Sequence, residues 1–461
     1  MRSKILWVLV GLSLVAVLGA GVLFGLQWRT QQAVDQAVAA LRARLPSGAT
    51  LSIDHTEIGL FDRSVGLSGI TLTVSAPRPA TLRIGSLRIE GLDPAIDQAI
   101  RFDHAIVRDV EAVVPDTKSR FTLAEATGDG VKLPVETLTA GLAGIARWDI
   151  GAAALSHAAF TAPDGGFDLD SATVTTLQQG ALGKLALGRS HATFPDDETG
   201  PIAVSLDEGD CTRIRLGALA DGSYLDHPAA AVGGCRVSGA RVAGSTIRLA
   251  ARSAAFTIDA RNGADGPVDA TTDLDALVIE APALAALQTR LGIPAVTLSL
   301  HAVQHGGPSG HGIEISDAVR IDHAGDLLVE GALGNLLGHS AFMADPQAAA
   351  QITIGPVRIA WTDQGLVPVL EAWASEGGPP AAQFPARAEA ELRDRLKQLG
   401  VSETTGDWPA KLALYLRKPG RIELTLTPVK AVQLRTLLDQ SLPPAAKFGL
   451  LQPKLTVEAA P

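Results

Sequence analysis

From residue 49 onward, apolar and polar residues alternate along much of the chain. In the run at 69–76, Ile70, Leu72 and Val74 occupy every second position and are separated by threonines. Successive side chains of a strand point to opposite faces of a sheet, so a period of two predicts strands with one apolar and one polar face. The same period recurs over residues 120–126, 167–177, 184–188, 201–206, 245–259, 273–281, 294–300, 312–322, 326–333 and 350–361.

A change of phase interrupts the alternation in the run that follows. Leu82 and Ile84 occupy positions of one phase. Leu87 and Ile89 occupy positions of the other. An extra residue in one strand of an antiparallel pair produces such a shift, so we predict a β-bulge at Gly85–Ser86.

The runs together predict a mainly β fold, an elongated and mostly antiparallel twisted sheet or groove. The pattern lacks the long helical crossovers that join parallel strands, which argues against a doubly wound enzyme fold. One short helix is expected at 282–291, where Leu284, Leu287 and Leu291 share a side and Gly292 follows the last turn.

Helical periodicity dominates after residue 361. The pattern predicts helices over 365–376, over 386–399, from Asp407 to a stop at Pro419, and over 431–442, with one strand at 421–428. We therefore divide the exported part of the chain into a strand-rich domain at 49–361 and an α/β C-terminal subdomain at 362–461.

Residues 5–26 form an uncharged apolar run of 22 residues. As a helix this run measures roughly 33 Å, enough to cross the hydrocarbon core of a bilayer. Arg2 and Lys4 precede it, which favours a cytoplasmic tip at residues 1–4 and export of the remainder. The alternative is a cleaved signal peptide, whose apolar region is usually shorter.

Residues 27–48 are expected to form a juxtamembrane helix and a linker. Val34, Val38, Leu41 and Leu45 recur at helical spacing. Two arrangements stay open: the helix continues the membrane segment as a straight rod, or it folds back over the first strands.

The chain carries a net charge of −10 at pH 7. An acidic domain repels phosphate groups, which argues against nucleic acid or anionic headgroups as the main partner and leaves only local basic patches as an alternative. Cys211 and Cys235 are the two cysteines of the chain. In an oxidising compartment they are expected to form one structural disulfide, and two buried free thiols are the alternative.

Motifs that carry chemistry are missing from the sequence, which contains no HExxH, Walker A, GxSxG or Gly-rich dinucleotide motif. His301 and His305 stand four positions apart in an alternating run. In a strand that spacing is roughly 13 Å, too far for two ligands of one metal ion. We therefore expect no catalytic residues, no metal ligands and no cofactor, and we predict that the protein is not an enzyme.

The layout of the N-terminal part is a short basic start, an apolar segment, a helix and then strands opening with LSIDHTEIGLFDRSVGLSGITLTVSAP at 51–77. It resembles the AsmA/TamB-like envelope proteins and the related YdgA-like group. The run at 361–428 resembles the end of an uncharacterised proteobacterial envelope family. The resemblance implies an inner-membrane anchor, a periplasmic β-domain whose apolar concave face cradles lipid chains, and a role in outer-membrane lipid homeostasis.

The leading hypothesis is a non-enzymatic envelope protein that handles lipid or maintains the outer membrane through an apolar β-groove. The expected location is the bacterial inner membrane, single-pass, with the bulk of the chain in the periplasm. The expected partners are that membrane, lipid acyl chains and other envelope proteins. Ile70, Leu72 and Val74 are the lipid-facing candidates. Two alternatives stay open: a scaffold whose closed β-domain binds another envelope protein, and an envelope hydrolase with a dispersed site.

Overall fold

The computed structural model describes residues 48–59, 63–75, 79–91, 99–134, 147–195, 200–216, 232–260, 268–306, 312–334, 351–375, 380–402 and 405–460. These residues form a mainly β fold of antiparallel strands with a few helices, which confirms the predicted fold class in this coarse form. The transmembrane helix predicted at 5–26 and the helix expected within 27–48 lie outside the described residues. No helix within the described ranges is long and apolar enough to cross a membrane.

The described residues fall into two compact units. Unit 1 runs to Ser245 and unit 2 begins at Thr246. This division lies inside the segment 49–361 that the sequence pattern groups into one strand-rich domain. The helix-rich segment from residue 362 onward belongs to unit 2.

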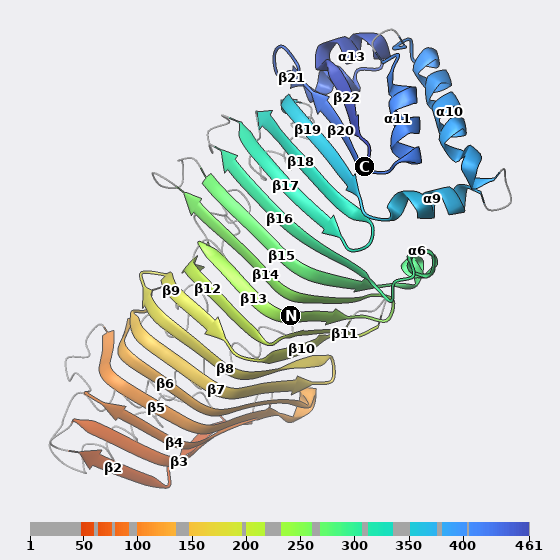
Figure 1. Ribbon diagram of the computed structural model, residues 1–461. Coiled ribbons are helices and arrows are strands. Elements are labelled where there is room, and N and C mark those ends of the chain that lie inside the picture. The colour runs from red at the N-terminus through yellow and green to blue at the C-terminus, as the bar shows by residue number, and fades with distance from the viewer. Residues whose placement is uncertain are drawn as a thin grey trace. The chain divides into compact units, whose positions relative to one another are not determined.

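Unit 1 is an antiparallel sheet, drawn from red to yellow-green in Figure 1. Its strands are β1 (Ala49–Ser52), β2 (His55–Gly59), β3 (Ser64–Val74), β4 (Ala80–Glu90), β5 (Ala99–Val114), β6 (Ser119–Pro134), β7 (Ile150–Ala162), β8 (Gly165–Gln178), β9 (Ala181–Leu187), β10 (Ser190–Phe194), β11 (Ile202–Leu206), β12 (Glu208–Arg215) and β13 (Gly234–Ala243). From β3 to β8 each strand pairs with the next, and β1 and β2 both lie along β3. Beyond β8 the ladder continues in two rows, β9–β12 and β10–β11, and both rows pair with β13.

Unit 2 combines a second run of paired strands with the helices of the C-terminal part. Its strands are β14 (Arg248–Ala260), β15 (Val268–Glu280), β16 (Val296–Gly306), β17 (Ile313–Ile321), β18 (Gly325–Gly334), β19 (Thr353–Asp363), β20 (Arg421–Leu426), β21 (Val432–Gln433) and β22 (Pro453–Glu458). From β14 to β20 each strand pairs with the next, β21 pairs with the start of β19, and β22 pairs with β20. The helices are α6 (Ala285–Leu291), α9 (Leu366–Ala374), α10 (Phe384–Gln398), α11 (Trp408–Arg417), α12 (Leu434–Leu438) and α13 (Pro444–Leu451).

Most of the predicted helices are confirmed, and one is wrong in part. The helix at 282–291 is present as a short 3-10 turn, Pro282–Leu284, that leads into α6 and ends at Gly292 in the left-handed region. The helix expected over 431–442 is shorter, because Val432 pairs with Ile354 of β19 and leaves only α12 helical. The sequence pattern did not predict α13 or β22.

The phase change predicted at Gly85–Ser86 is present, but it is not a bulge. Ser68 pairs with Ser86 and Ile70 with Ile84, so the ladder gains no extra residue. The partner strands change phase at the same level, where Gly69 has a φ of 64° and Asp109 of β5 a φ of 54°. A true register shift occurs in unit 2 instead, between Leu274 and Leu277 of β15.

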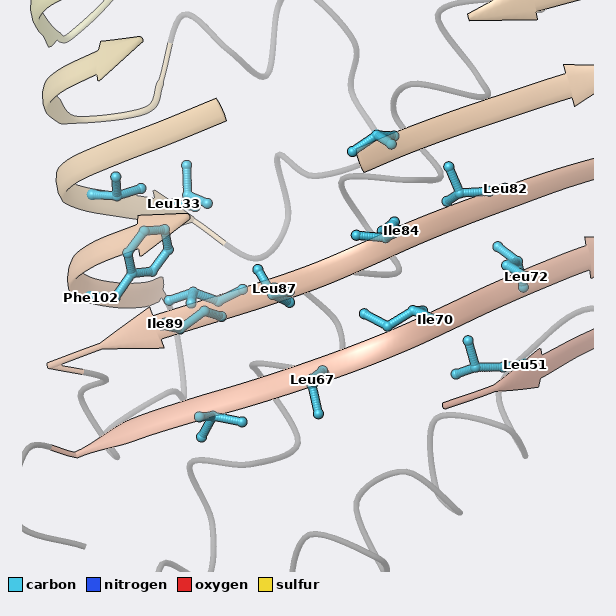
Figure 2. Close-up of a cluster of buried hydrophobic side chains, with 14 of the residues drawn as sticks. Leu51, Leu67, Ile70, Leu72, Leu82, Ile84, Leu87, Ile89, Phe102 and Leu133 are labelled. Atoms are coloured by element: carbon cyan, nitrogen blue, oxygen red, sulfur yellow. The ribbon is translucent and has the colours of Figure 1, made fainter. Parts of the chain in front are cut away.

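The first strands of unit 1 bury a continuous cluster of aliphatic side chains (Figure 2). Because β3 and β4 change phase together, residues of both phases point to the same face of the sheet. The cluster comprises Leu51, Val65, Leu67, Ile70, Leu72, Leu82, Ile84, Leu87, Ile89, Ile100, Phe102, Val110, Ala112, Val131 and Leu133. Burial of this many large apolar side chains is the main stabilising contribution in this part of unit 1.

Candidate functional site

One line of cross-strand neighbours crosses unit 1 and contains apolar residues alone. In order across the sheet it consists of Leu51, Leu72, Leu82, Ala112, Phe121, Phe160, Phe167, Ala192, Val204 and Val242. Directly opposite residues of an antiparallel sheet point to the same face. The line therefore defines the apolar face of unit 1, a surface that no single strand could provide.

The opposite face of unit 1 is polar and carries cross-strand ion pairs. Arg108 of β5 donates to Glu125 of β6 at 2.7 Å, and Lys184 of β9 lies 2.9 Å from Asp210 of β12. The partners are largely solvent-exposed, and such pairs contribute little stability. These pairs place exposed charges on this face of unit 1, whereas the apolar residues lie on the other face.

The three lipid-facing candidates lie on β3, and all three contact the apolar cluster. Ile70 is 6% exposed and Leu72 is 4% exposed, whereas Val74 is half-buried. Leu72 lies between Leu51 of β1 and Leu82 of β4. The structure thus brings the three residues together on one face, and their contact with lipid stays a prediction.

A second line of apolar cross-strand neighbours lies on the same face of unit 1, and Cys211 and Cys235 are its last two residues. That line runs from Val65 through Ile89, Ala105, Gly128, Ala153, Val174 and Leu185 to Cys211 and Cys235. The sulfur atoms of the two cysteines are joined at 2.11 Å. The cross-link therefore ties β12 to β13 at the last strand of the unit.

Unit 2 has an apolar face of its own, formed in the same way. Its first line runs through Ala254, Leu274, Leu300, Val319, Leu327, Trp361, Ile422 and Val457. The neighbouring line runs through Phe256, Thr272, Ala302, Asp317, Val329, Ile359, Leu424 and Leu455. From Leu274 to Val457 the first line is half-buried throughout, and Ile359 in the second is 38% exposed. This face is thus more open than the buried cluster of unit 1.

Asp317 is the acidic exception in the second line of this face. Its cross-strand neighbours are Ala302 and Val329. Its Oδ1 atom is buried and has no hydrogen-bond partner within the described residues. A carboxylate oxygen next to aliphatic side chains adds an acceptor for a polar group to a largely apolar surface.

Helices of the C-terminal part cover one end of the unit 2 face. Val367 of α9 and Tyr415 of α11 belong to a cluster that packs against the last three residues of the first line, Trp361, Ile422 and Val457. The carboxylate of Asp363 accepts the backbone N–H groups of Gly365 and Val367 at 3.0 Å, and so fixes the start of α9 against the sheet. Burial raises the pKa of Tyr415, the Asp363 charge adds to this, and the Tyr415 hydroxyl stays neutral.

The two histidines weighed as metal ligands lie on the opposite, polar face of unit 2. Nδ1 of His301 lies 2.6 Å from Asp273, and His305 pairs with Asp269 in the same way. Each histidine therefore contacts its own cross-strand carboxylate. Within the described ranges, no group of three or more His, Cys, Asp or Glu side chains could hold a metal ion.

Comparison with known proteins gives a match to a family model. A family model described as "Uncharacterized protein" matches residues 318–460, a segment that runs from β17 to the end of β22 and includes the C-terminal helices. No curated protein matches the chain. The match thus covers the part of unit 2 in which helices close the end of the apolar face.

Proposed function

We propose that this chain is a non-enzymatic, membrane-anchored protein that binds lipid acyl chains on an apolar sheet face. The observation that supports this best is the half-buried apolar line of unit 2 from Leu274 to Leu327, which precedes the residues that the C-terminal helices cover. A soluble surface rarely leaves so many contiguous apolar side chains partly open, and such patches usually mark a binding site. An acyl chain is apolar along its whole length, so it matches a long aliphatic surface that offers few polar groups.

Burial differs along unit 1 itself, because its apolar line is buried from Leu51 to Ala112 and half-buried from Phe121 to Val242, as the line of unit 2 is. Leu72 and its neighbours in unit 1 are buried, which favours a closed core there. This observation favours the scaffold alternative for unit 1, whose packed sheet would hold a partner envelope protein through other surfaces. We place the acyl-chain site on unit 2, because Ile359 in the middle of its face is 38% exposed, more than any large apolar residue in the two lines of unit 1.

The membrane anchor of this proposal is the apolar segment at 5–26, a sequence-based expectation. Together with Arg2 and Lys4 it supports an inner-membrane location with both units in the periplasm. In that arrangement the apolar face of unit 2 would bind the acyl chains of lipids that move through the periplasm or are used in envelope maintenance.

A photo-crosslinking experiment tests the acyl-chain site. The full chain in detergent is mixed with a phospholipid that carries a photoreactive acyl chain, and cross-linked peptides are mapped by mass spectrometry. Crosslinks are expected on β17 to β20. The variant Ile359→Asp should lose them, because a carboxylate repels the acyl chain from the middle of the face.

The matched control is Val303→Asp. Val303 is 37% exposed, almost the same as Ile359, but it lies on the opposite face of β16 from Ala302 and Leu300. This variant should retain the crosslinks. Equal labelling of wild type and Ile359→Asp, or equal loss in both variants, would refute the acyl-chain site.

A further inference from the structure

The segment 427–454 of unit 2 exposes large aliphatic side chains. Val429 is 80% exposed, Leu438 65% and Leu450 40%. Val429 and Leu438 are the two most exposed large hydrophobic side chains in the described part of the chain. Scattered exposed leucines are ordinary, but several in one short segment indicate a surface that contacts something apolar.

The elements β21, β22 and α13 of this segment lie together at one end of unit 2 (Figure 1). The backbone N–H of Thr427 donates to the carbonyl of Leu451 at 3.0 Å, which places the loop that carries Val429 beside the last turn of α13. The carboxylate of Asp439, directly after α12, feels the charge of Lys447 on α13. The loop, α12 and α13 are therefore neighbours, and we call this surface the C-terminal patch.

The C-terminal patch is basic in an acidic protein. Segment 427–454 contains the four basic residues Lys430, Arg435, Lys447 and Lys454 against the one acidic residue Asp439, a net charge of +3, whereas the whole chain carries −10. Hydrogen bonds from Ser441 lower the pKa of Asp439, with a smaller effect from Lys447, so this carboxylate stays charged. The sign of the local charge is thus opposite to that of the chain as a whole.

We propose that the C-terminal patch binds the surface of a bilayer that contains anionic phospholipid. Exposed aliphatic side chains enter the boundary between headgroups and acyl chains, while lysine and arginine side chains pair with lipid phosphates. Protein interfaces favour aromatic residues and arginine and are depleted of lysine. Three of the four basic residues here are lysines, and the exposed apolar residues are aliphatic. This composition favours a lipid surface over a protein partner.

This membrane contact does not depend on the acyl-chain site. The two sites use different residues, since the acyl-chain site lies on the sheet face around Ile359 and the C-terminal patch lies at the loop, α12 and α13. If the photo-crosslinking result refutes the acyl-chain site, the vesicle experiment still tests the C-terminal patch, and the reverse also holds.

A vesicle flotation experiment tests the proposal. The full chain is reconstituted into nanodiscs of phosphatidylcholine, which shield its predicted membrane segment. It is then mixed with vesicles of pure phosphatidylcholine, or of equal parts phosphatidylcholine and phosphatidylglycerol. The protein should float with the anionic vesicles and not with the neutral ones, and added salt should weaken the binding.

Two variants measure separately what the basic side chains and the aliphatic side chains of the C-terminal patch contribute to vesicle binding. Lys430→Gln combined with Arg435→Gln should lower the partition coefficient about fivefold for each charge removed. Leu438→Asn should lower it at unchanged net charge, because only the aliphatic contact is lost. Both variants change exposed side chains, so both should keep the melting temperature of the wild type.

Phe194→Asp is the control, because Phe194 is 53% exposed but lies at the end of β10 in unit 1. It should bind anionic vesicles like the wild type. Equal binding to both vesicle compositions, no binding to either, or an equal loss in Phe194→Asp would overturn the proposal.

Discussion

Cys211 and Cys235 face each other directly across β12 and β13, with their Cα atoms 4.0 Å apart. Both side chains lie on the apolar face of unit 1, and Leu185 of β9 is the next neighbour in their line. The pair therefore joins the last strand of the unit to the one before it, at the end of an apolar line rather than on the solvent-exposed face.

The first prediction is that these cysteines form a disulfide in an oxidising compartment. In the chain-entropy description, a cross-link over this separation contributes about 3 kcal/mol to stability. Cys211→Ser should lose about that amount in urea unfolding, and the reduced wild type should lose a similar amount. Mass mapping that finds both thiols free in protein purified from the envelope would contradict the prediction.

A second prediction concerns Gly69, where the first strands change phase. Gly69 has a φ of 64°, and a Cβ atom there would lie 2.1 Å from Oδ2 of Asp54. Gly69→Ala combines a left-handed backbone with this clash, so it should lower the free energy of unfolding by at least about 1 kcal/mol. The measurement is the urea midpoint.

Gly66→Ala is the matched control on the same strand. A Cβ atom at Gly66 would lie 3.5 Å from Cβ of Glu57, an ordinary contact distance. This variant should keep a midpoint close to that of the wild type. A Gly69→Ala protein as stable as Gly66→Ala would show that the phase change does not need glycine.

The third prediction is acid sensitivity of unit 2 through Glu423. Arg358 of β19 donates to Glu423 of β20 at 2.9 Å, and this hydrogen bond is the largest cause of a lowered pKa of Glu423. A carboxyl whose pKa is lower in the folded state adds stability above its unfolded pKa of 4.5. That stability is lost as pH falls from 4.5 through the lower folded value.

Glu423→Gln should therefore reduce stability at neutral pH and flatten the acid dependence below pH 4.5. Melting temperatures of wild type and variant, compared at neutral pH and well below pH 4.5, measure both effects. The gap between them should close on acidification. A gap that stays constant across this range would rule out the pair as a source of acid sensitivity.

The strands could be predicted from the sequence because apolar and polar residues alternate within each strand, whatever its neighbours are. Ile70, Leu72 and Val74 show it within one short run, and the helix at 282–291 shows its leucines and its terminal glycine. The apolar lines could not be predicted, because they depend on register between strands. Nothing local to Leu72 specifies that it pairs with Leu51 on one side and Leu82 on the other.

Two predictions were wrong for physical reasons that cannot be read from the sequence pattern. The predicted bulge assumed that the partner strands stay extended, whereas Gly69 and Asp109 change phase together with Gly85. The predicted helix at 431–442 lost its first residues because pairing of Val432 with β19 outweighed local helical preference. Tertiary pairing decides both cases.

The fourth prediction concerns topology and rests on the sequence alone. The apolar run at 5–26 and the preceding Arg2 and Lys4 predict that the body of the chain lies outside the cytoplasm. Alkaline phosphatase fused after residue 60 should be active, because it folds only in an oxidising compartment. An inactive fusion, together with an active cytoplasmic reporter at the same position, would reverse this topology.

The last prediction separates a closed core from a lipid-accessible face in unit 1. Leu72 is 4% exposed and lies between Leu51 and Leu82. Leu72→Asp would bury a carboxylate without a partner, so it should lower the free energy of unfolding by several kcal/mol. Thr71→Asp, the control on the opposite face of β3, should cost far less because its cross-strand neighbour is Arg83. If unit 1 is closed, wild-type β3 gives no crosslink with the photoreactive lipid. A small stability loss in Leu72→Asp, with a wild-type crosslink on β3 that the variant abolishes, would instead show that lipid reaches this face as well.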